Sequence, residues 1–336
     1  MEKIKIAQIG VTHEHAGGKY ETLMRMSDVF ELVGVYNDAE IATTPNFPGD
    51  ITKTYHDVNW MSLDEILNYP GLQAVAVEVP NNELVPIALR CAEKGLAMHM
   101  DKPAGEEMAP FKQLLDVCKA KNLPFQMGYM FRGNPAFQFC IEAIRSKLIG
   151  DVVEIIADMN HCYGGEPYQD YISSFHGGIM FNLGCHLIDF VVAAMGRPTA
   201  VTPFIKPAPG YGPGYKNNCS AVLEYPGALV YLRSCSKDST CRRAMKIAGT
   251  KGTLSFSPLE RFDRVPMEID LRLFDKSNGY PSGLHTLRFT MDADRYRPQL
   301  QELADVIHGK RESTYSYEHE HTVHEVVLAA SGIYDL

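Results

Sequence analysis

The stretch Ala74-Val75-Ala76-Val77-Glu78-Val79-Pro80 is a near-continuous apolar run that ends at a proline. Such a run predicts a β-strand buried on both faces, as in a parallel sheet. A helical stretch over 84–94 follows, and it stops at Gly95. A second buried strand over 97–100 then leads into Asp101-Lys102-Pro103. The sequence thus predicts a lysine at the end of a parallel strand, beside a proline that cannot continue the ladder.

The same alternation continues on both sides of this stretch. Further strands are predicted over 3–9, 31–36 and 125–127, and helices over 21–26 and 106–121. A capping box at Ser62–Glu65 predicts one more short helix. Strand and helix alternate in this way to about residue 128. This pattern predicts an α/β domain over 1–128 with an open, doubly wound parallel sheet of the dinucleotide-binding Rossmann type.

The pattern changes after residue 128, where long alternating runs are separated by turn signals. Strands are predicted over 152–159, 221–225, 229–234, 245–248, 267–274 and 286–289, and helices over 134–148, 297–308 and 321–331. Residues 129–336 are therefore predicted to form an α+β domain with a large, open, mainly antiparallel sheet. An apolar sheet face left uncovered by helices would expose too much surface, so we expect a homodimer or homotetramer formed through this sheet.

Charge and composition exclude several classes of partner. The chain carries 32 Lys and Arg against 41 Asp and Glu, a net charge of −9, which argues against nucleic acid or an anionic membrane as a partner. It has neither a run of about 18 apolar residues that would span a membrane nor an apolar leader at its start. Its 8 cysteines are scattered and form no Cys-x-x-Cys, which indicates reduced thiols in a cytoplasmic protein.

The turn after the first strand reads Gly10-Val11-Thr12-His13-Glu14-His15. A dinucleotide fingerprint has glycine at the first, third and sixth positions, and only Gly10 fits. Backbone N–H groups at a helix N-terminus still attract phosphate, and protonated His13 or His15 can contact the pyrophosphate of a cofactor. The alternative is that both histidines only cap the helix or face solvent.

The second strand ends at Asn37-Asp38. An acid at this position normally binds the ribose hydroxyls and repels a 2′-phosphate. No Lys or Arg follows within the turn, so the sequence favours NAD over NADP. Asp38 can alternatively be a turn residue only. Pro80, Asn81, Asp101 and Lys102, at the ends of the following strands, complete the predicted cofactor-binding set.

A third motif lies in the second half of the chain, at Gly177-Gly178 and Asn182-Leu-Gly-Cys-His186-Leu-Ile-Asp189. Together with Glu78–Asn81, Asp101–Pro103, 128–135 and 318–332, it makes the chain resemble the Gfo/Idh/MocA oxidoreductases, which include glucose-fructose oxidoreductase and inositol dehydrogenase. The resemblance implies a Rossmann domain followed by an open-faced sheet domain. That sheet would carry the substrate on one face and commonly a subunit interface on the other.

The resemblance also implies catalytic roles for three residues. Lys102 would hydrogen-bond the reacting hydroxyl, His186 would take or give its proton, and Asn182 would assist. The residue types agree, because a lysine stabilises developing negative charge and a histidine titrates near neutral pH. The family usually has Asp where this chain has Asn182, and an amide cannot stabilise an imidazolium by charge.

The implied reaction is NAD(P)-dependent hydride transfer from a ring secondary alcohol of a sugar, an inositol or a glycoside. Asn182 and the glycine-poor turn leave two alternatives. One is a redox-neutral lyase or glycosidase that uses the nicotinamide transiently, and the other is a non-catalytic protein that binds cofactor or sugar.

Five further residues are candidates for substrate binding: Arg132, Asn134, His161, Tyr163 and His176. The first two either bind a sugar hydroxyl or pin the domain junction, and the other three are alternatively polar surface residues. No metal site is predicted. Histidines two apart on a helix, such as 13 and 15, point away from each other and match no zinc spacing.

Overall fold

The computed structural model describes residues 2–39, 51–261 and 263–336. The chain divides into two compact units, the first comprising Met1–Tyr129 and Tyr296–His321 and the second comprising Met130–Arg295 and Thr322–Leu336. The predicted domain boundary between residues 128 and 129 lies one residue before the boundary between the two units, which falls after Tyr129. The prediction of one continuous second domain differs from the structure, because the segment Tyr296–His321 belongs to unit 1.

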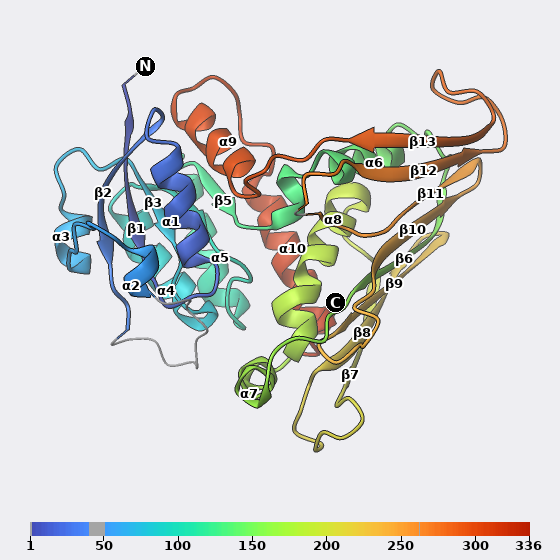
Figure 1. The fold of residues 1–336 in the computed structure, drawn as a ribbon, viewed down its shortest axis with the longest axis horizontal. Helices are drawn as coiled ribbons and strands as arrows, with labels where there is room; N and C mark the ends of the chain where they lie inside the picture. Colours follow the sequence, from blue (N-terminus) through green and yellow to red (C-terminus); the bar gives the residue numbers. More distant parts are fainter. Residues whose placement is uncertain (1, 40–50, 262) are drawn as a thin grey trace. The chain divides into compact units, whose positions relative to one another are not determined.

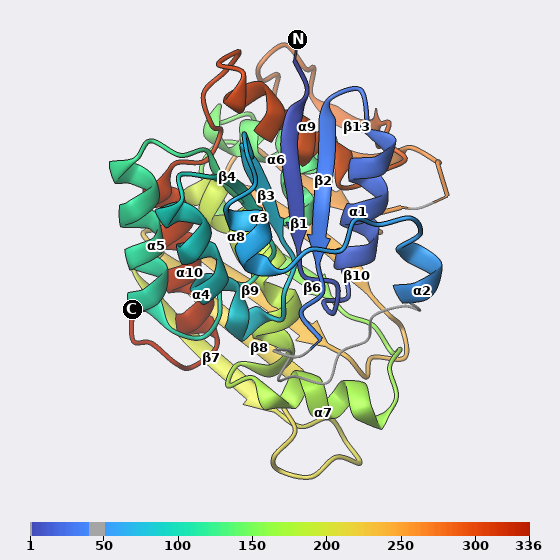
Figure 2. The same cartoon turned by 90° about the vertical axis from the view of Figure 1, so that its left-hand side faces the viewer.

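Unit 1 contains the predicted Rossmann-type sheet (Figures 1 and 2). All its strand pairs are parallel, in the order β2-β1-β3-β4-β5. Its elements are β1 (Ile4–Ile9), α1 (Ala16–Arg25), β2 (Phe30–Tyr36), α2 (Ile51–Thr54), α3 (Leu63–Leu67), β3 (Ala74–Val77), α4 (Asn81–Glu93), β4 (Ala97–Met100), α5 (Met108–Ala120), β5 (Phe125–Met127) and α9 (Arg297–Ile307). The α/β class of this region is confirmed.

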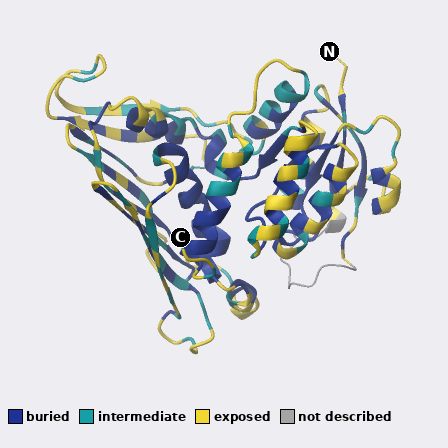
Figure 3. Cartoon of the chain, turned by 180° about the vertical axis from the view of Figure 1, so that it is seen from behind, coloured by how far each residue is buried: buried dark blue, intermediate teal, exposed yellow. Residues whose placement is uncertain are grey.

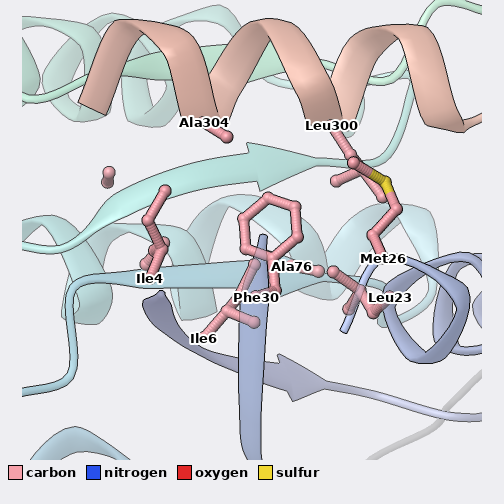
Figure 4. Packing of buried hydrophobic residues seen from close by; sticks show 10 residues of the cluster. Ile4, Ile6, Leu23, Met26, Phe30, Ala76, Leu300 and Ala304 are labelled. Atoms are coloured by element: carbon pink, nitrogen blue, oxygen red, sulfur yellow. The ribbon is translucent and has the colours of Figure 1, made fainter. Parts of the chain in front are cut away.

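Helix α9 belongs to unit 1 because its apolar stripe completes the core on one face of the sheet. Leu300 and Ala304 pack with Leu23 of α1 and with Ile4 and Phe30 of the strands (Figure 4). Leu300, Ala304 and Ile4 are all fully buried. Burying a Leu or Ile side chain stabilises a fold by about 1.5–3 kcal/mol, which explains why this late segment of the chain returns to the first unit.

Unit 2 is an α+β unit with an eight-stranded sheet in the order β13-β12-β11-β10-β6-β9-β8-β7. Its elements are α6 (Pro135–Arg145), β6 (Val152–Met159), α7 (Glu166–Ser174), α8 (Cys185–Met195), β7 (Ala200–Lys206), β8 (Asn218–Tyr225), β9 (Ala228–Cys235), β10 (Arg243–Gly249), β11 (Gly252–Phe256), β12 (Met267–Leu273) and β13 (Gly283–Phe289). Helix α10 (Tyr317–Ala330) begins in unit 1 and ends in unit 2. The described strands pair antiparallel except for β6 and β9, which are parallel. The predicted, mainly antiparallel sheet is therefore confirmed.

The two faces of this sheet differ in burial. Residues alternate between buried and exposed along β9 and β12, so that one face is apolar and covered (Figure 3). Helix α6 packs on β12 and β13, and a π-helical turn over Met180–Gly184 packs on β8 and β9. The opposite face exposes five large apolar side chains: Ile156, Phe204, Leu229, Tyr231 and Leu284.

Among the described helices, none combines the length and the apolar composition needed to cross a lipid bilayer.

Candidate functional site

Gly10 lets the ends of β1 and β3 approach each other closely. Its φ is +106°, and a Cβ at this position would lie 2.6 Å from the backbone carbonyl of Glu78. Only glycine tolerates both conditions. The strand order reverses between β1 and β3, and open α/β sheets bind their ligands outside the carboxyl ends of the strands at such a point.

Asp38 holds the β1–α1 turn in place. One carboxylate oxygen accepts the N–H groups of Val11 and Thr12 at 2.8 and 3.1 Å, and the other accepts the Thr12 hydroxyl at 2.6 Å. The Asp38 side chain is fully buried, whereas Asn37 is exposed and accepts the N–H of Ala39. The carboxylate predicted to bind ribose therefore makes structural hydrogen bonds, and Asn37 is the exposed polar group at this strand end.

His13 and His15 converge on Asp101, at the end of β4. The Nδ1 atoms of the two imidazoles lie 2.7 and 2.9 Å from the same carboxylate oxygen, Oδ2 of Asp101. The prediction that the rings of His13 and His15 point apart is wrong. Both residues precede α1, which begins at Ala16, so helical spacing does not apply to them. The alternative that they face solvent does not hold for His13, whose side chain is 1% exposed. His15 is the N-cap residue of α1, but its side chain makes no cap hydrogen bond there, and Nδ1 of His13 accepts the backbone N–H of His15 at 3.3 Å.

These contacts set the charges of the cluster. Burial opposes protonation of His13, but the nearby carboxylates, Asp101 foremost, outweigh it and raise the His13 pKa. Burial lowers the pKa of His15 to about 4. Burial would raise the Asp101 pKa, yet the two imidazoles hold it well below its usual range. The cluster thus contains an ionised carboxylate beside two imidazoles in a mostly buried site.

Beside this cluster lies a buried polar chain that the sequence analysis missed. The ammonium group of Lys19, on α1, lies 3.1 Å from Oε1 of Glu78 and 2.6 Å from Nε2 of His99. His99 Nδ1 in turn contacts Gln126 Oε1 at 2.8 Å. Burial raises the pKa of Glu78 to about 7. The sequence does contain a sign of this chain, because Glu78 and His99 are titratable residues inside the otherwise apolar stretches 74–79 and 97–100.

Lys102 is 1% exposed and is the second residue after β4. Its backbone carbonyl accepts a hydrogen bond of 2.8 Å from the side-chain amide of Asn81, the first residue of α4, and its peptide bond to Pro103 is cis. Pro80 is the residue that precedes α4. Two of the predicted cofactor residues, Asn81 and Lys102, therefore meet within unit 1.

In unit 2, His186 lies in the first turn of α8 and is 2% exposed. Its Nδ1 accepts a hydrogen bond of 3.4 Å from the backbone N–H of Met130. Asn182 lies in the preceding π-helical turn and is also buried.

The glycine pair Gly177-Gly178, before this turn, allows the chain to pack closely against Ser331 and Lys216. A Cβ at Gly177 would lie 2.2 Å from the hydroxyl of Ser331. Gly178 has a φ of +54°, and its Cβ would lie 2.0 Å from the carbonyl oxygen of Lys216. Both positions require glycine for steric reasons.

Arg132 and Asn134 have structural partners. The guanidinium of Arg132 forms a bidentate pair with Asp189 of α8, with a shortest distance of 2.6 Å, and both side chains are almost fully buried. Asn134 caps α6, where its carbonyl oxygen accepts the N–H groups of Ala136 and Phe137. These contacts hold both side chains within unit 2.

His161 and Tyr163 lie side by side. Their rings stack with centroids 3.7 Å apart, and His161 Nε2 lies 3.2 Å from the hydroxyl of Tyr168, which the sequence analysis missed. His161 is buried, so the alternative that it is a surface residue is wrong, whereas Tyr163 is 56% exposed. His176 is exposed, on the segment that precedes the glycine pair.

Comparison with known proteins places these features in a family. Residues 4–129 match the model of an oxidoreductase family with an NAD-binding Rossmann fold, and residues 137–255 match the GFO/IDH/MocA C-terminal domain. An uncharacterized oxidoreductase of Rhizobium meliloti is 26% identical over 73% of each chain. The trans-1,2-dihydrobenzene-1,2-diol dehydrogenase of Sus scrofa is 22% identical over 60% of this chain and 58% of that protein.

Solved structures show the same fold over nearly the whole chain. A putative NADPH-dependent oxidoreductase from Desulfitobacterium hafniense has a TM-score of 0.79 at 22% identity, covering 99% of this chain and 96% of that one. An Agrobacterium radiobacter oxidoreductase, in complex with NAD+, L-tartaric acid and magnesium, has a TM-score of 0.79 at 14% identity with the same coverage.

The two family models follow each other along the chain, in the order of its two predicted domains, and confirm the resemblance to that family. The chain is a member of the Gfo/Idh/MocA oxidoreductases, with an NAD-binding Rossmann domain at its N-terminal end.

Proposed function

We propose that the protein is an NAD-dependent dehydrogenase that moves hydride between nicotinamide and a ring secondary alcohol of a sugar, an inositol or a glycoside. The observation that carries the proposal is the burial of Lys102 at the carboxyl end of a central parallel strand, in the Rossmann unit of an oxidoreductase. A cation in such a position stabilises the negative charge that develops on an alcohol oxygen as hydride leaves.

The residues of the β1–α1 turn fit a dinucleotide. Nε2 of His13 is a buried polar atom with no hydrogen-bond partner among the described residues. A phosphate oxygen of the cofactor is a suitable partner for it, and Asn37 is the exposed group that would bind the ribose. The charge of Asp38 and the absence of Lys or Arg beside it favour NAD over NADP.

Each catalytic side chain has one task in this proposal. When bound, the nicotinamide supplies the hydride acceptor. Lys102 would hydrogen-bond the substrate oxygen and hold it as it gains alkoxide character. His186 would take the proton of that oxygen as hydride leaves and return it in the reverse direction. His161, Tyr163 and His176 are the proposed substrate-binding residues.

The test is the rate of NADH formation over a panel of polyols and sugars. Lys102→Ala should lower turnover by about 10²–10⁴-fold, the range typical of acid–base and electrostatic groups. Lys112→Ala is the matched control, because Lys112 is exposed on α5 and pairs with Asp116 one turn away. An unchanged rate in Lys102→Ala would remove Lys102 from the mechanism.

Asn182 favours a second candidate, in which a tightly held nicotinamide oxidises the substrate, elimination or hydrolysis follows, and the product is re-reduced. The amide cannot stabilise an imidazolium by charge as the usual carboxylate does. Such a redox-neutral lyase or glycosidase accumulates no net NADH while it consumes substrate. Product analysis alongside the NADH assay separates the two reactions. Ligand binding without turnover of any substrate would instead indicate a non-catalytic binding protein.

We also propose that the exposed face of the unit 2 sheet forms the contact of a homodimer or homotetramer. Ile156 and Tyr231 are register partners on β6 and β9, so their side chains lie next to each other on that face. Both are exposed large apolar residues. A contiguous apolar surface of this kind is typical of a subunit interface.

A further inference from the structure

Two histidines and one aspartate place metal-ligating atoms together in unit 1. His13 and His15 come from the β1–α1 turn and Asp101 from the end of β4, 86 residues further along the chain than His15. One ligand atom from each residue lies within 4.8 Å of the other two. The side chains of His13 and Asp101 are each 1% exposed, and that of His15 is 15% exposed.

Hydrogen bonds alone leave this cluster incomplete. Both imidazole Nδ1 atoms approach Oδ2 of Asp101, while Oδ1 of the same carboxylate has no hydrogen-bond partner among the described residues. Nε2 of His13 has none there either. Buried polar atoms are satisfied in the large majority of cases. Two imidazoles and a carboxylate that bring one ligand atom each within 4.8 Å of one another, in a mostly buried place, are arranged as the ligands of a cation are.

We propose that His13, His15 and Asp101 bind one divalent transition-metal ion. The distances of 2.7 and 2.9 Å from Asp101 Oδ2 to the two Nδ1 atoms fit ligands of a single ion. With metal–ligand bonds of about 2.0–2.2 Å, such separations subtend angles of about 80–90° at the metal, as neighbouring ligands of a six-coordinate ion do. Two imidazoles and a carboxylate select first-row ions such as Mn²⁺, Fe²⁺, Co²⁺ or Zn²⁺ over Ca²⁺ and Mg²⁺, and they leave coordination positions open.

The position of the site suggests a role for the metal ion, and this role rests on the proposed dinucleotide cofactor. In a standard dinucleotide turn, free backbone N–H groups receive the pyrophosphate. Here Asp38 already accepts the N–H groups of Val11 and Thr12. A metal ion with open positions at the same turn would supply the positive charge for a phosphate oxygen of the cofactor.

Metal titration of the full chain tests the site. The protein is freed of metal with EDTA and titrated with Co²⁺ by visible absorption and with Zn²⁺ by calorimetry. We expect one equivalent per chain, with affinity lowered at least about 100-fold in His13→Ala, His15→Ala and Asp101→Asn, since loss of a ligand costs more than the 10–100-fold that loss of a supporting group costs. His321→Ala is the control, because His321 lies on α10 and is not one of the three proposed ligands.

Three outcomes would overturn the proposal: no saturable binding at micromolar metal, binding unchanged in the three variants, or equal loss in the His321→Ala control. Circular dichroism and the thermal midpoint show which variants fold. If Asp101→Asn unfolds, His15→Gln decides instead, because His15 is the most exposed of the three ligands.

Fluorescence titration with NADH, in EDTA and again after Co²⁺ is restored, tests separately whether the metal ion helps to bind a phosphate of the cofactor. Binding that needs the metal supports that role, and binding of equal strength without metal overturns it. A protein that binds the metal but no NADH would refute the proposed dehydrogenase and leave the metal site intact.

Discussion

Oδ2 of Asp38 and the hydroxyl of Thr12 form a buried hydrogen bond of 2.6 Å, which ties the end of β2 to the turn after β1. Thr12 stands where a dinucleotide fingerprint has its second glycine. The turn is therefore shaped by a side-chain carboxylate as well as by the conformational freedom of Gly10.

Asp38→Asn should weaken both the fold and cofactor binding. The substitution keeps the size of the side chain but removes the charge and one acceptor, so a buried donor of the turn loses its partner, at a cost of about 1–3 kcal/mol. We expect a lower thermal midpoint and NADH binding weaker by at least about tenfold, which corresponds to 1.4 kcal/mol. Differential scanning fluorimetry and NADH fluorescence check both. Asn37→Ala, at the exposed neighbour, should keep the midpoint, and an unchanged midpoint in Asp38→Asn would contradict the role given to Asp38.

The Arg132–Asp189 pair should matter for stability and not for substrate affinity. Arg132→Ala leaves a buried carboxylate without its counter-charge, which costs about 3–5 kcal/mol, whereas the double variant Arg132→Met/Asp189→Leu should recover most of this loss. Urea unfolding of the single and double variants measures it. If the double variant is as stable as wild type but its KM for the substrate is much higher, Arg132 binds substrate after all.

The ionisation of Glu78 should make stability fall as pH rises. Burial raises the Glu78 pKa from 4.5 to about 7, so between these values the folded protein keeps a proton that the unfolded chain has lost. Linkage then predicts that the unfolding free energy of wild type relative to Glu78→Gln falls by up to about 3 kcal/mol from pH 4.5 to pH 8. The ammonium group of Lys19, 3.1 Å from Glu78 Oε1, stabilises the ionised carboxylate and so offsets part of this loss of stability. Urea unfolding of EDTA-treated protein at several pH values tests it, and parallel profiles for the two proteins would count against it.

Cys162 and Cys241 should form a disulfide under oxidising conditions. Both thiols are exposed, and their sulfur atoms lie 2.9 Å apart. The contact with Cys241 raises the Cys162 pKa, so thiolate attack on an added disulfide such as oxidised glutathione should quicken with rising pH. The second thiol then displaces the glutathione, and two molecules of reduced glutathione are released. Peptide mass mapping without reductant should find the 162–241 link, and Cys162→Ser should abolish it. Exclusive glutathionylation of either cysteine would show that the two cannot join.

A charge on the exposed face of the unit 2 sheet should break the proposed oligomer. Tyr231→Glu places a carboxylate in the apolar surface that also contains Ile156. Burying that charge in an interface costs several kcal/mol, so sedimentation at micromolar concentration should shift from a dimer or tetramer to a monomer. Lys112→Glu, on α5 of unit 1, is the control for a change of charge alone. A wild-type protein that sediments as a monomer would refute the proposed oligomer directly.

The sequence by itself determined the local features of the fold. The apolar run at 74–79, the alternating runs after residue 152 and the capping box at Ser62 and Glu65 are patterns of contiguous residues, and the structure has a parallel sheet, a mainly antiparallel sheet and that same box. Local patterns suffice here because hydrophobic periodicity and capping depend on neighbours along the chain.

Only the tertiary structure decided which distant side chains meet. It brought Asp101 to His13 and His15, turned Asp38 onto Thr12, paired Arg132 with Asp189 and returned α9 to the first unit. No spacing in the sequence encodes these contacts, because each depends on how whole strands and helices pack. The charges they set at the β1–α1 turn are therefore properties of the folded chain alone.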